Sequence, residues 1–154
     1  MTRSTTATRW LSELEMQAWR SYVETQSDLQ TALEADLQPT GLNLGDYQVL
    51  VFLSEADDRR MRMCDLAELL QLSPSGLTRR LDGLVRKGLV ERVGSDLDRR
   101  VMLAVLTPDG LAQLEAAAPT HVDSVRAHLI DLLDTDELEA LVRIFSKVRA
   151  ALDR

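Results

Sequence analysis

Three hydroxyl side chains and two guanidinium groups lie close together in one short stretch of the sequence. Ser73, Ser75 and Thr78 are followed by the adjacent Arg79 and Arg80. Hydroxyl groups bind phosphates or base edges, and a guanidinium can donate two hydrogen bonds to guanine O6 and N7. These residue types in one stretch indicate a surface that contacts nucleic acid, although a solvated helix face would carry similar residues.

A second polar cluster, Asp98-Arg99-Arg100, lies in a loop between two short β-prone runs. The runs are Leu89–Val93 and Val101–Leu106. Short β-prone runs on both sides of a polar loop predict a β-hairpin. Arginine side chains at the tip of such a hairpin can reach into a minor groove.

Two predicted helices precede this hairpin. The first covers residues 65–70, and the second begins at Ser73-Pro74, a good N-cap followed by a proline in the first turn. Apolar residues recur along one face of the second helix until Gly88 ends it. Helix, turn, helix and hairpin in this order predict a winged helix-turn-helix, whose second helix has the shape to enter a major groove.

Helical patterns also flank this unit on both sides. They cover residues 10–37, 43–54, 107–132 and 135–152, and Pro119 predicts a kink or a break in the third. The segments at the two ends carry apolar faces with no local partner, which predicts a dimer interface. The fold class is therefore mainly α with a small β-hairpin wing. We divide the chain into an N-terminal dimerisation helix with a disordered start (1–40), a winged helix-turn-helix domain (41–107) and C-terminal dimerisation helices (108–154).

The charge is distributed unevenly along the chain. The net charge is −7, yet residues 59–100 hold ten Lys or Arg against six Asp or Glu, a balance of +4 that leaves −11 elsewhere. A local positive field determines where a polyanion binds. The 154 residues contain no apolar run of membrane-spanning length and a single cysteine, Cys64, so we expect a soluble cytoplasmic protein without disulfides.

Four stretches of the chain resemble the MarR family of bacterial transcription regulators. They are Leu72–Arg79, Leu84–Arg92, Asp98–Arg100 and Leu106–Gly110, in the family order and spacing. The resemblance is dense from about Leu42 to Gly110, whereas the flanking helices match by pattern and position only.

The resemblance implies DNA contacts from the second helix and from the wing. In the family, an arginine at the wing tip enters the minor groove and an aspartate holds the wing arginines in place. Here these positions match Asp98 and Arg100, Arg99 is able to share the role, and Arg92 is the expected partner of Asp98. The resulting set of expected DNA-binding residues is Ser73, Ser75, Gly76, Thr78, Arg79, Arg80, Asp98, Arg99 and Arg100.

The resemblance also implies an aromatic effector pocket between the dimerisation helices and the winged domain. Trp19, Tyr22 and Tyr47 are the candidates to stack on a small phenolic ligand, although core or interface positions explain them equally well. His121 and His128 lack metal-ligand companions and are interpreted as surface residues, and Cys64 as a buried, inert thiol.

These observations predict a homodimeric regulator, most simply a repressor, that binds a palindromic duplex and responds to a small-molecule effector. No phosphate-binding glycine loop, nucleophile with a base, metal cluster or cofactor motif stands out, so we expect no enzyme activity, no cofactor and no membrane partner. The alternative is a winged-helix module that binds another protein, which the acidic net charge favours.

Overall fold

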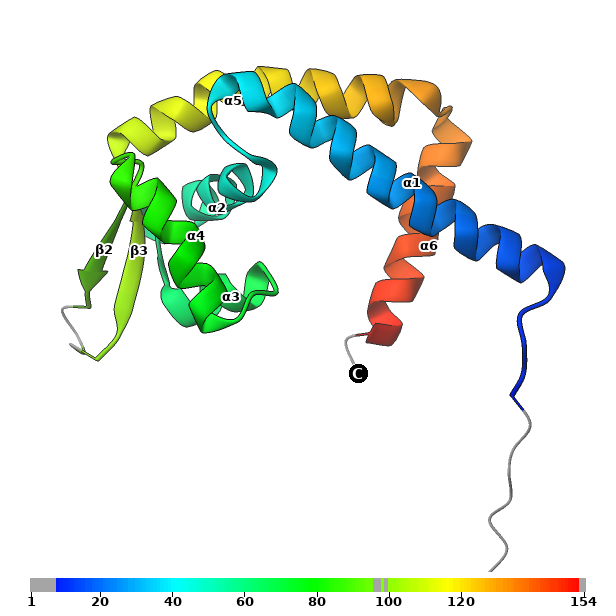
Figure 1. Ribbon diagram of the computed structural model, residues 1–154, viewed down its shortest axis with the longest axis horizontal. Coiled ribbons are helices and arrows are strands. Elements are labelled where there is room, and N and C mark those ends of the chain that lie inside the picture. Colours follow the sequence, from blue (N-terminus) through cyan, green and yellow to red (C-terminus); the bar gives the residue numbers. More distant parts are fainter. Residues whose placement is uncertain (1–7, 96–97, 99, 153–154) are drawn as a thin grey trace, which may run out of the picture.

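The protein forms an arch whose upper part is built from two long helices (Figure 1). The computed structural model describes residues 8–95, 98 and 100–152. Helices α1 (Glu13–Leu37) and α5 (Pro108–His128) lie side by side along the arch, and α6 (Thr135–Leu152) descends beside the N-terminal half of α1. The predicted disordered start falls largely on residues 1–7, which lie outside the described residues.

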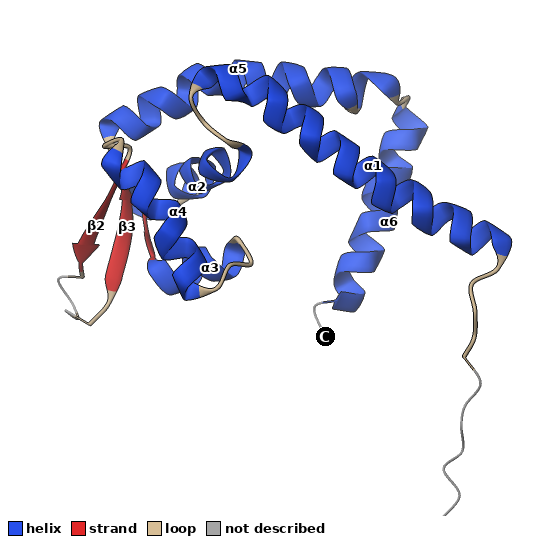
Figure 2. Ribbon diagram, viewed as in Figure 1, coloured by secondary structure: helices blue, strands red, loops and turns tan. Residues whose placement is uncertain are grey.

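The other side of the arch is a winged helix-turn-helix (Figure 2). Its helices are α2 (Leu44–Glu55), α3 (Met63–Leu69) and α4 (Pro74–Arg86). Its strands are β1 (Arg60–Arg62), β2 (Val90–Gly94) and β3 (Met102–Leu106). The sheet is antiparallel in the order β1-β3-β2, so the wing is a hairpin extended by one very short strand. Short 3-10 turns occupy Gln38–Thr40, Asp57–Arg59 and Ile130–Leu132.

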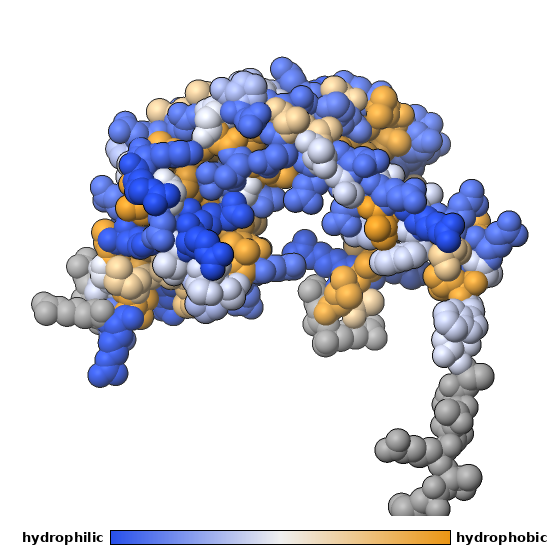
Figure 3. Space-filling view, viewed as in Figure 1, coloured by the Kyte–Doolittle hydropathy of each residue, from blue (hydrophilic) through white to orange (hydrophobic). Residues whose placement is uncertain are grey.

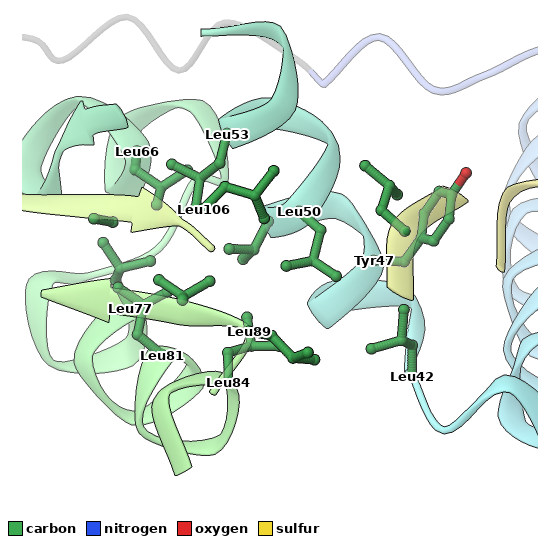
Figure 4. Packing of buried hydrophobic residues seen from close by; sticks show 14 of the residues in the cluster. Leu42, Tyr47, Leu50, Leu53, Leu66, Leu77, Leu81, Leu84, Leu89 and Leu106 are labelled. Carbon is green, nitrogen blue, oxygen red and sulfur yellow. The ribbon is translucent and has the colours of Figure 1, made fainter. Parts of the chain in front are cut away.

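Leucine side chains fill the core of the winged unit (Figure 4). Leu50 and Leu53 of α2 meet Leu66 of α3 and Leu81 of α4, and all four are fully buried. Each fully buried leucine contributes about 1.5–3 kcal/mol of hydrophobic stabilisation. This packing, rather than the weak helix propensity of short segments, holds α4 in place.

Side-chain caps begin the helices where the sequence predicts them. The Asn43 Oδ1 accepts a hydrogen bond from the Asp46 N–H at 2.7 Å, and the Thr107 Oγ1 accepts one from the Gly110 N–H at 2.9 Å. Helix α3 begins at Met63, and its N-cap residue Arg62 makes no side-chain cap hydrogen bond. Capping depends on a few adjacent residues, so these helix starts can be read from the sequence.

Helix α5 continues without interruption through Pro119, so the proline does not split it. The predicted extension of this helix to Leu132 is wrong, because α5 ends at His128 and a 3-10 turn follows. An ion pair of Arg126 with Asp131, 2.5 Å apart, spans this end. No helix in the described part of the chain combines the length and the apolar character that crossing a membrane requires.

Candidate nucleic-acid interface

Helix α4 is anchored at its start and along one face. The Ser73 Oγ accepts a hydrogen bond from the Gly76 N–H at 3.1 Å, and Pro74 occupies the first helical position. Leu77, Leu81 and Leu84 are buried against the core. An anchored helix can present its opposite face to a ligand without losing further backbone entropy.

The opposite face of α4 is polar and exposed. It carries Ser75, Thr78 and Arg79. The Thr78 Oγ1 donates to the Pro74 carbonyl at 2.9 Å, and the Ser75 Oγ lies 3.2 Å from the Ser73 Oγ. The Arg79 side chain makes no hydrogen bond or ion pair with another described residue, so its guanidinium is available to an external acceptor.

Arg80 lies on a different side of α4. Its side chain is 32% exposed, and its Nη1 donates to the Asn43 Oδ1 at 3.2 Å and lies 3.7 Å from the Asp46 Oδ1. The guanidinium is therefore directed toward the start of α2, away from the exposed face that carries Arg79. The structure thus separates two adjacent arginines to which the sequence assigned the same role.

The wing loop is organised by Asp98. Its Oδ1 accepts a hydrogen bond from the Arg100 N–H at 2.9 Å, and its carbonyl accepts one from the Val101 N–H at 2.9 Å. Asp98 therefore shapes the turn through backbone groups. The Arg100 side chain is exposed at the tip, while Arg99, which the resemblance also implicates, lies outside the described residues.

Arg92 joins the wing to α4. Its Nη2 donates to the Asp82 Oδ1 at 2.6 Å and to the Thr78 carbonyl at 2.8 Å. The expected pairing of Arg92 with Asp98 is therefore wrong. Asp82 is the residue that sequence reasoning missed, because only the packing of β2 beside α4 brings it within reach of Arg92.

The three candidate effector residues divide between two places. The Trp19 and Tyr22 ring centroids are 6.0 Å apart, and Tyr22 lies 6.0 Å from Phe145 of α6. Tyr47 is buried and packs against His121, with the ring centroids 4.5 Å apart. A pocket of about 300 Å³ lies elsewhere, between α1, α2 and α4. Its lining residues are Gln30, Glu34, Asn43, Leu44, Gly45, Gln48 and Arg80.

Two interpretations of single residues are corrected here. His121 is half-buried against Tyr47, and burial lowers the pKa of its imidazole, so it is not a plain surface residue. His128 is exposed but bound, with its Nε2 2.8 Å from the Asp36 Oδ2. Cys64 is exposed rather than buried, because α3 turns Leu66 and Ala67 toward the core and leaves Cys64 outside. No cluster of metal-binding side chains occurs within the described residues.

Comparison with known proteins identifies relatives of this chain. The profile of the MarR family matches residues 40–101. The HTH-type transcriptional repressor YetL of Bacillus subtilis is 32% identical over 97 residues, a match that covers 63% of this chain and 58% of YetL. The aligned stretch therefore spans less than two thirds of that relative.

Two crystal structures from Streptomyces coelicolor match almost the whole chain. AbsC, a MarR family transcriptional regulator, is 42% identical with a TM-score of 0.90, over 95% of this chain and 99% of AbsC. Sco3205, a MarR family regulator solved in complex with DNA, is 35% identical with a TM-score of 0.89, over 94% of this chain and 92% of Sco3205. The predicted fold class is confirmed, and so is the prediction that the chain is not an enzyme, because these relatives are transcriptional regulators. The chain belongs to the MarR family.

Proposed function

We propose that this protein is a homodimeric transcriptional repressor that binds a palindromic duplex through two winged helix-turn-helix units. One observation carries the proposal: helix α4 presents Ser75, Thr78 and an unpaired Arg79 on an exposed face, beside a wing that ends in Arg100. A similar structure, Sco3205, was solved in complex with DNA. Repression is supported by the name of the relative YetL.

A dimer is supported by the apolar side chains that α1 and α6 leave uncovered. Helix α6 has no buried residue, and α1 has only Leu37 among its 25 residues. Figure 3 shows apolar surface over α6 and the N-terminal part of α1. The large exposed apolar residues of these two helices include Leu14, Trp19, Tyr22, Val23, Val142, Ile144, Phe145, Val148 and Leu152.

A two-fold dimer places two recognition helices on one side of a duplex. Successive major grooves on the same side of DNA are about 34–36 Å apart, so each copy of α4 would read one half of a palindrome. In this arrangement the exposed Arg79 and Arg100 would face DNA. Affinity would come largely from phosphates and would fall steeply with salt.

An aromatic effector is a further part of this proposal. The exposed rings of Trp19 and Tyr22, beside Phe145, offer stacking surfaces where α1 meets α6. A planar phenolic ligand that binds there would change how the two copies pack and so change the distance between their α4 helices. Titration with phenolic acids, followed by tryptophan fluorescence and by DNA affinity, tests this part separately.

Binding experiments with purified protein test the DNA-binding proposal. A duplex is first selected from a random-sequence library by the wild-type protein, and its affinity is then measured by fluorescence anisotropy at several salt concentrations. Arg100→Ala removes the exposed wing guanidinium from both copies of the dimer, so we expect weaker binding and a salt slope smaller by about two units, one for each copy. Arg79→Ala should relax specificity at one base pair in each half-site, by about 1–3 kcal/mol.

Arg126→Ala serves as the control because it removes one positive charge from α5, away from α4 and the wing. It should bind the selected duplex like the wild type. Wild-type affinity of Arg100→Ala would contradict the role of the wing. Failure of the wild type to select any duplex would favour a protein-binding module.

A further inference from the structure

A buried carboxylate lies where the recognition helix meets α2. Asp46, in the first turn of α2, is 7% exposed. Its Oδ1 lies 3.7 Å from the Arg80 Nη1, and its Oδ2 lies 3.9 Å from the Lys87 Nζ. Arg80 and Lys87 are two helical turns apart, so one carboxylate contacts α4 and its C-cap residue at two separate points.

Both basic side chains are held at these positions by further contacts. The Arg80 guanidinium also rests on Gly45, where any Cβ atom would overlap it. The Lys87 Nζ donates a hydrogen bond to the Gly41 carbonyl at 3.0 Å. The side chains that attach α4 to the start of α2 are therefore separate from those on the exposed face of α4.

The start of α2 is in turn bound to α1. The Glu34 Oε2 accepts a hydrogen bond from the Leu44 N–H at 2.8 Å. A continuous set of polar contacts thus runs from the long helix α1, through the first turn of α2, to α4. We call Glu34, Asp46, Arg80 and Lys87 the polar junction.

The negative charge on Asp46 lowers the stability of the folded protein. Burial raises the pKa of Asp46 above its ordinary value, and the attraction of Lys87 and Arg80 and the Asn43 hydrogen bond offset this only in part, with Glu34 adding repulsion. A raised pKa in the folded state means that protonation favours folding. The ionised carboxylate is therefore stabilised less in the folded protein than in the unfolded chain. A neutral side chain of the same shape at this position avoids the desolvation cost of the carboxylate.

We propose that Asp46 is a positioning residue for DNA recognition, which holds α4 against α2 and so sets the distance and tilt between the two recognition helices of a dimer. This inference rests on the proposed function. Arg80 and Lys87 then act within the protein as attachments for α4, while Arg79 and Arg100 face the duplex. Because the polar junction links α1 to α4, it determines which separation of half-sites the dimer accepts.

The test compares Asp46→Asn with the wild type on duplexes selected by the wild-type protein. The substitution keeps the shape and removes the charge that holds Arg80 and Lys87. The dissociation constant for the selected duplex should rise about tenfold, because α4 is no longer held in the orientation that the duplex requires. For a random-sequence duplex it should stay unchanged or fall, because the two released cations can reach phosphates.

A second readout distinguishes positioning from a general loss of structure. Duplexes are prepared in which the two half-sites are one base pair closer together or farther apart. The wild type should reject both, whereas Asp46→Asn should bind the altered and the selected duplexes with similar affinity. Partial unfolding would weaken binding to all of them equally. Thermal unfolding in the same buffer should show Asp46→Asn to be as stable as the wild type or more stable.

Gly45→Ala tests the junction without removing a charge. Its methyl group displaces the Arg80 guanidinium, so this variant should also lose discrimination between half-site spacings. Gly83→Ala is the matched control, since a Cβ at position 83 meets nothing within 4 Å. It should discriminate like the wild type.

Two results would overturn the inference. If Asp46→Asn and Gly45→Ala both reject altered spacings as the wild type does, the junction does not position α4, although DNA binding itself stands. If the wild type selects no duplex at all, the proposed function fails and the inference fails with it.

Discussion

Arg92 shows how one side chain can hold together the two parts of the proposed DNA-binding surface, the wing and α4. Its guanidinium donates charge-assisted hydrogen bonds to Asp82 and to the Thr78 carbonyl of α4, while its backbone lies in β2. Such bonds are about twice as strong as neutral ones. The wing and the recognition helix are therefore ordered relative to each other before DNA arrives, which lowers the entropy lost on binding.

His121 should make stability depend on pH. Its ring packs against Tyr47, its Nδ1 is buried without a hydrogen-bond partner in the described structure, and burial lowers the pKa of the imidazole below 6.5. The unfolded chain then binds more protons at mildly acidic pH, so stability is full above pH 6.5 and falls as the pH drops toward the folded-state pKa.

His121→Phe keeps an aromatic ring against Tyr47 and removes the proton site. We expect a smaller loss of stability than in the wild type when urea denaturation at pH 7.5 is compared with pH 5.5. The same decrease in both proteins would contradict this role for His121.

Among the elements, the contact between α5 and the connection from α4 to β2 leaves no room for a side chain. Gly110, in the first turn of α5, lies so close to the Leu89 carbonyl that an added Cβ would overlap this backbone atom. Gly83, within α4, has open space around its Cα. The same substitution should therefore have opposite effects at these two glycines.

Gly110→Ala should destabilise the fold by about 1–3 kcal/mol, because the backbone must shift. Gly83→Ala should stabilise it by up to about 1 kcal/mol, because alanine loses less entropy in a helix. Chemical denaturation of both variants beside the wild type measures the difference. Equal effects of the two substitutions would contradict the close approach at Gly110.

Local signals explain why the helix starts could be predicted. The caps at Asn43, Ser73 and Thr107 depend on residues within one turn, and all three form in the structure. The pairing of Arg92 with Asp82 depends on how β2 packs against α4, which no local pattern contains. The sequence predicts the winged fold and an exposed hydroxyl-and-arginine face. The partners of Arg80 and Arg92 had to come from the tertiary structure.

It was also difficult to predict which residues of α3 are buried, because this too depends on tertiary contacts. Leu66, Leu69 and Leu70 have helical spacing, yet Leu66 is fully buried while Leu69 is 51% exposed. In a helix of seven residues the pattern is too short to define one face, and contact with α4 and the sheet decides it. Cys64 is exposed for the same reason, because the side of α3 that packs on the core carries Leu66 and Ala67.

At the scale of the whole molecule, the apolar stripe on α6 makes a dimer the simplest way to cover this helix. Phe145→Glu places a negative charge on that stripe. In a two-fold interface both copies would contribute this charge, so two carboxylates would be buried together. We expect dimerisation to weaken by about a hundredfold or more, as for a central interface residue. Sedimentation at micromolar concentration should then show a monomer with reduced affinity for DNA.

Lys147→Glu is the matched control because Lys147 lies on the opposite side of the same helix from Phe145, at helical spacing. It should sediment like the wild type. A dimer that persists in Phe145→Glu would place the interface elsewhere.

Because α6 has no buried residue, its packing has a consequence for the concentration of this protein in a cell. A newly synthesised monomer would leave α6 weakly packed. Its exposed apolar surface would then be accessible to proteases and chaperones. Mass action then links survival of each copy to the number of others present. If copies pair through α6, the protein would be degraded quickly at low concentration and slowly at high concentration. Its level would then rise more steeply than its rate of synthesis.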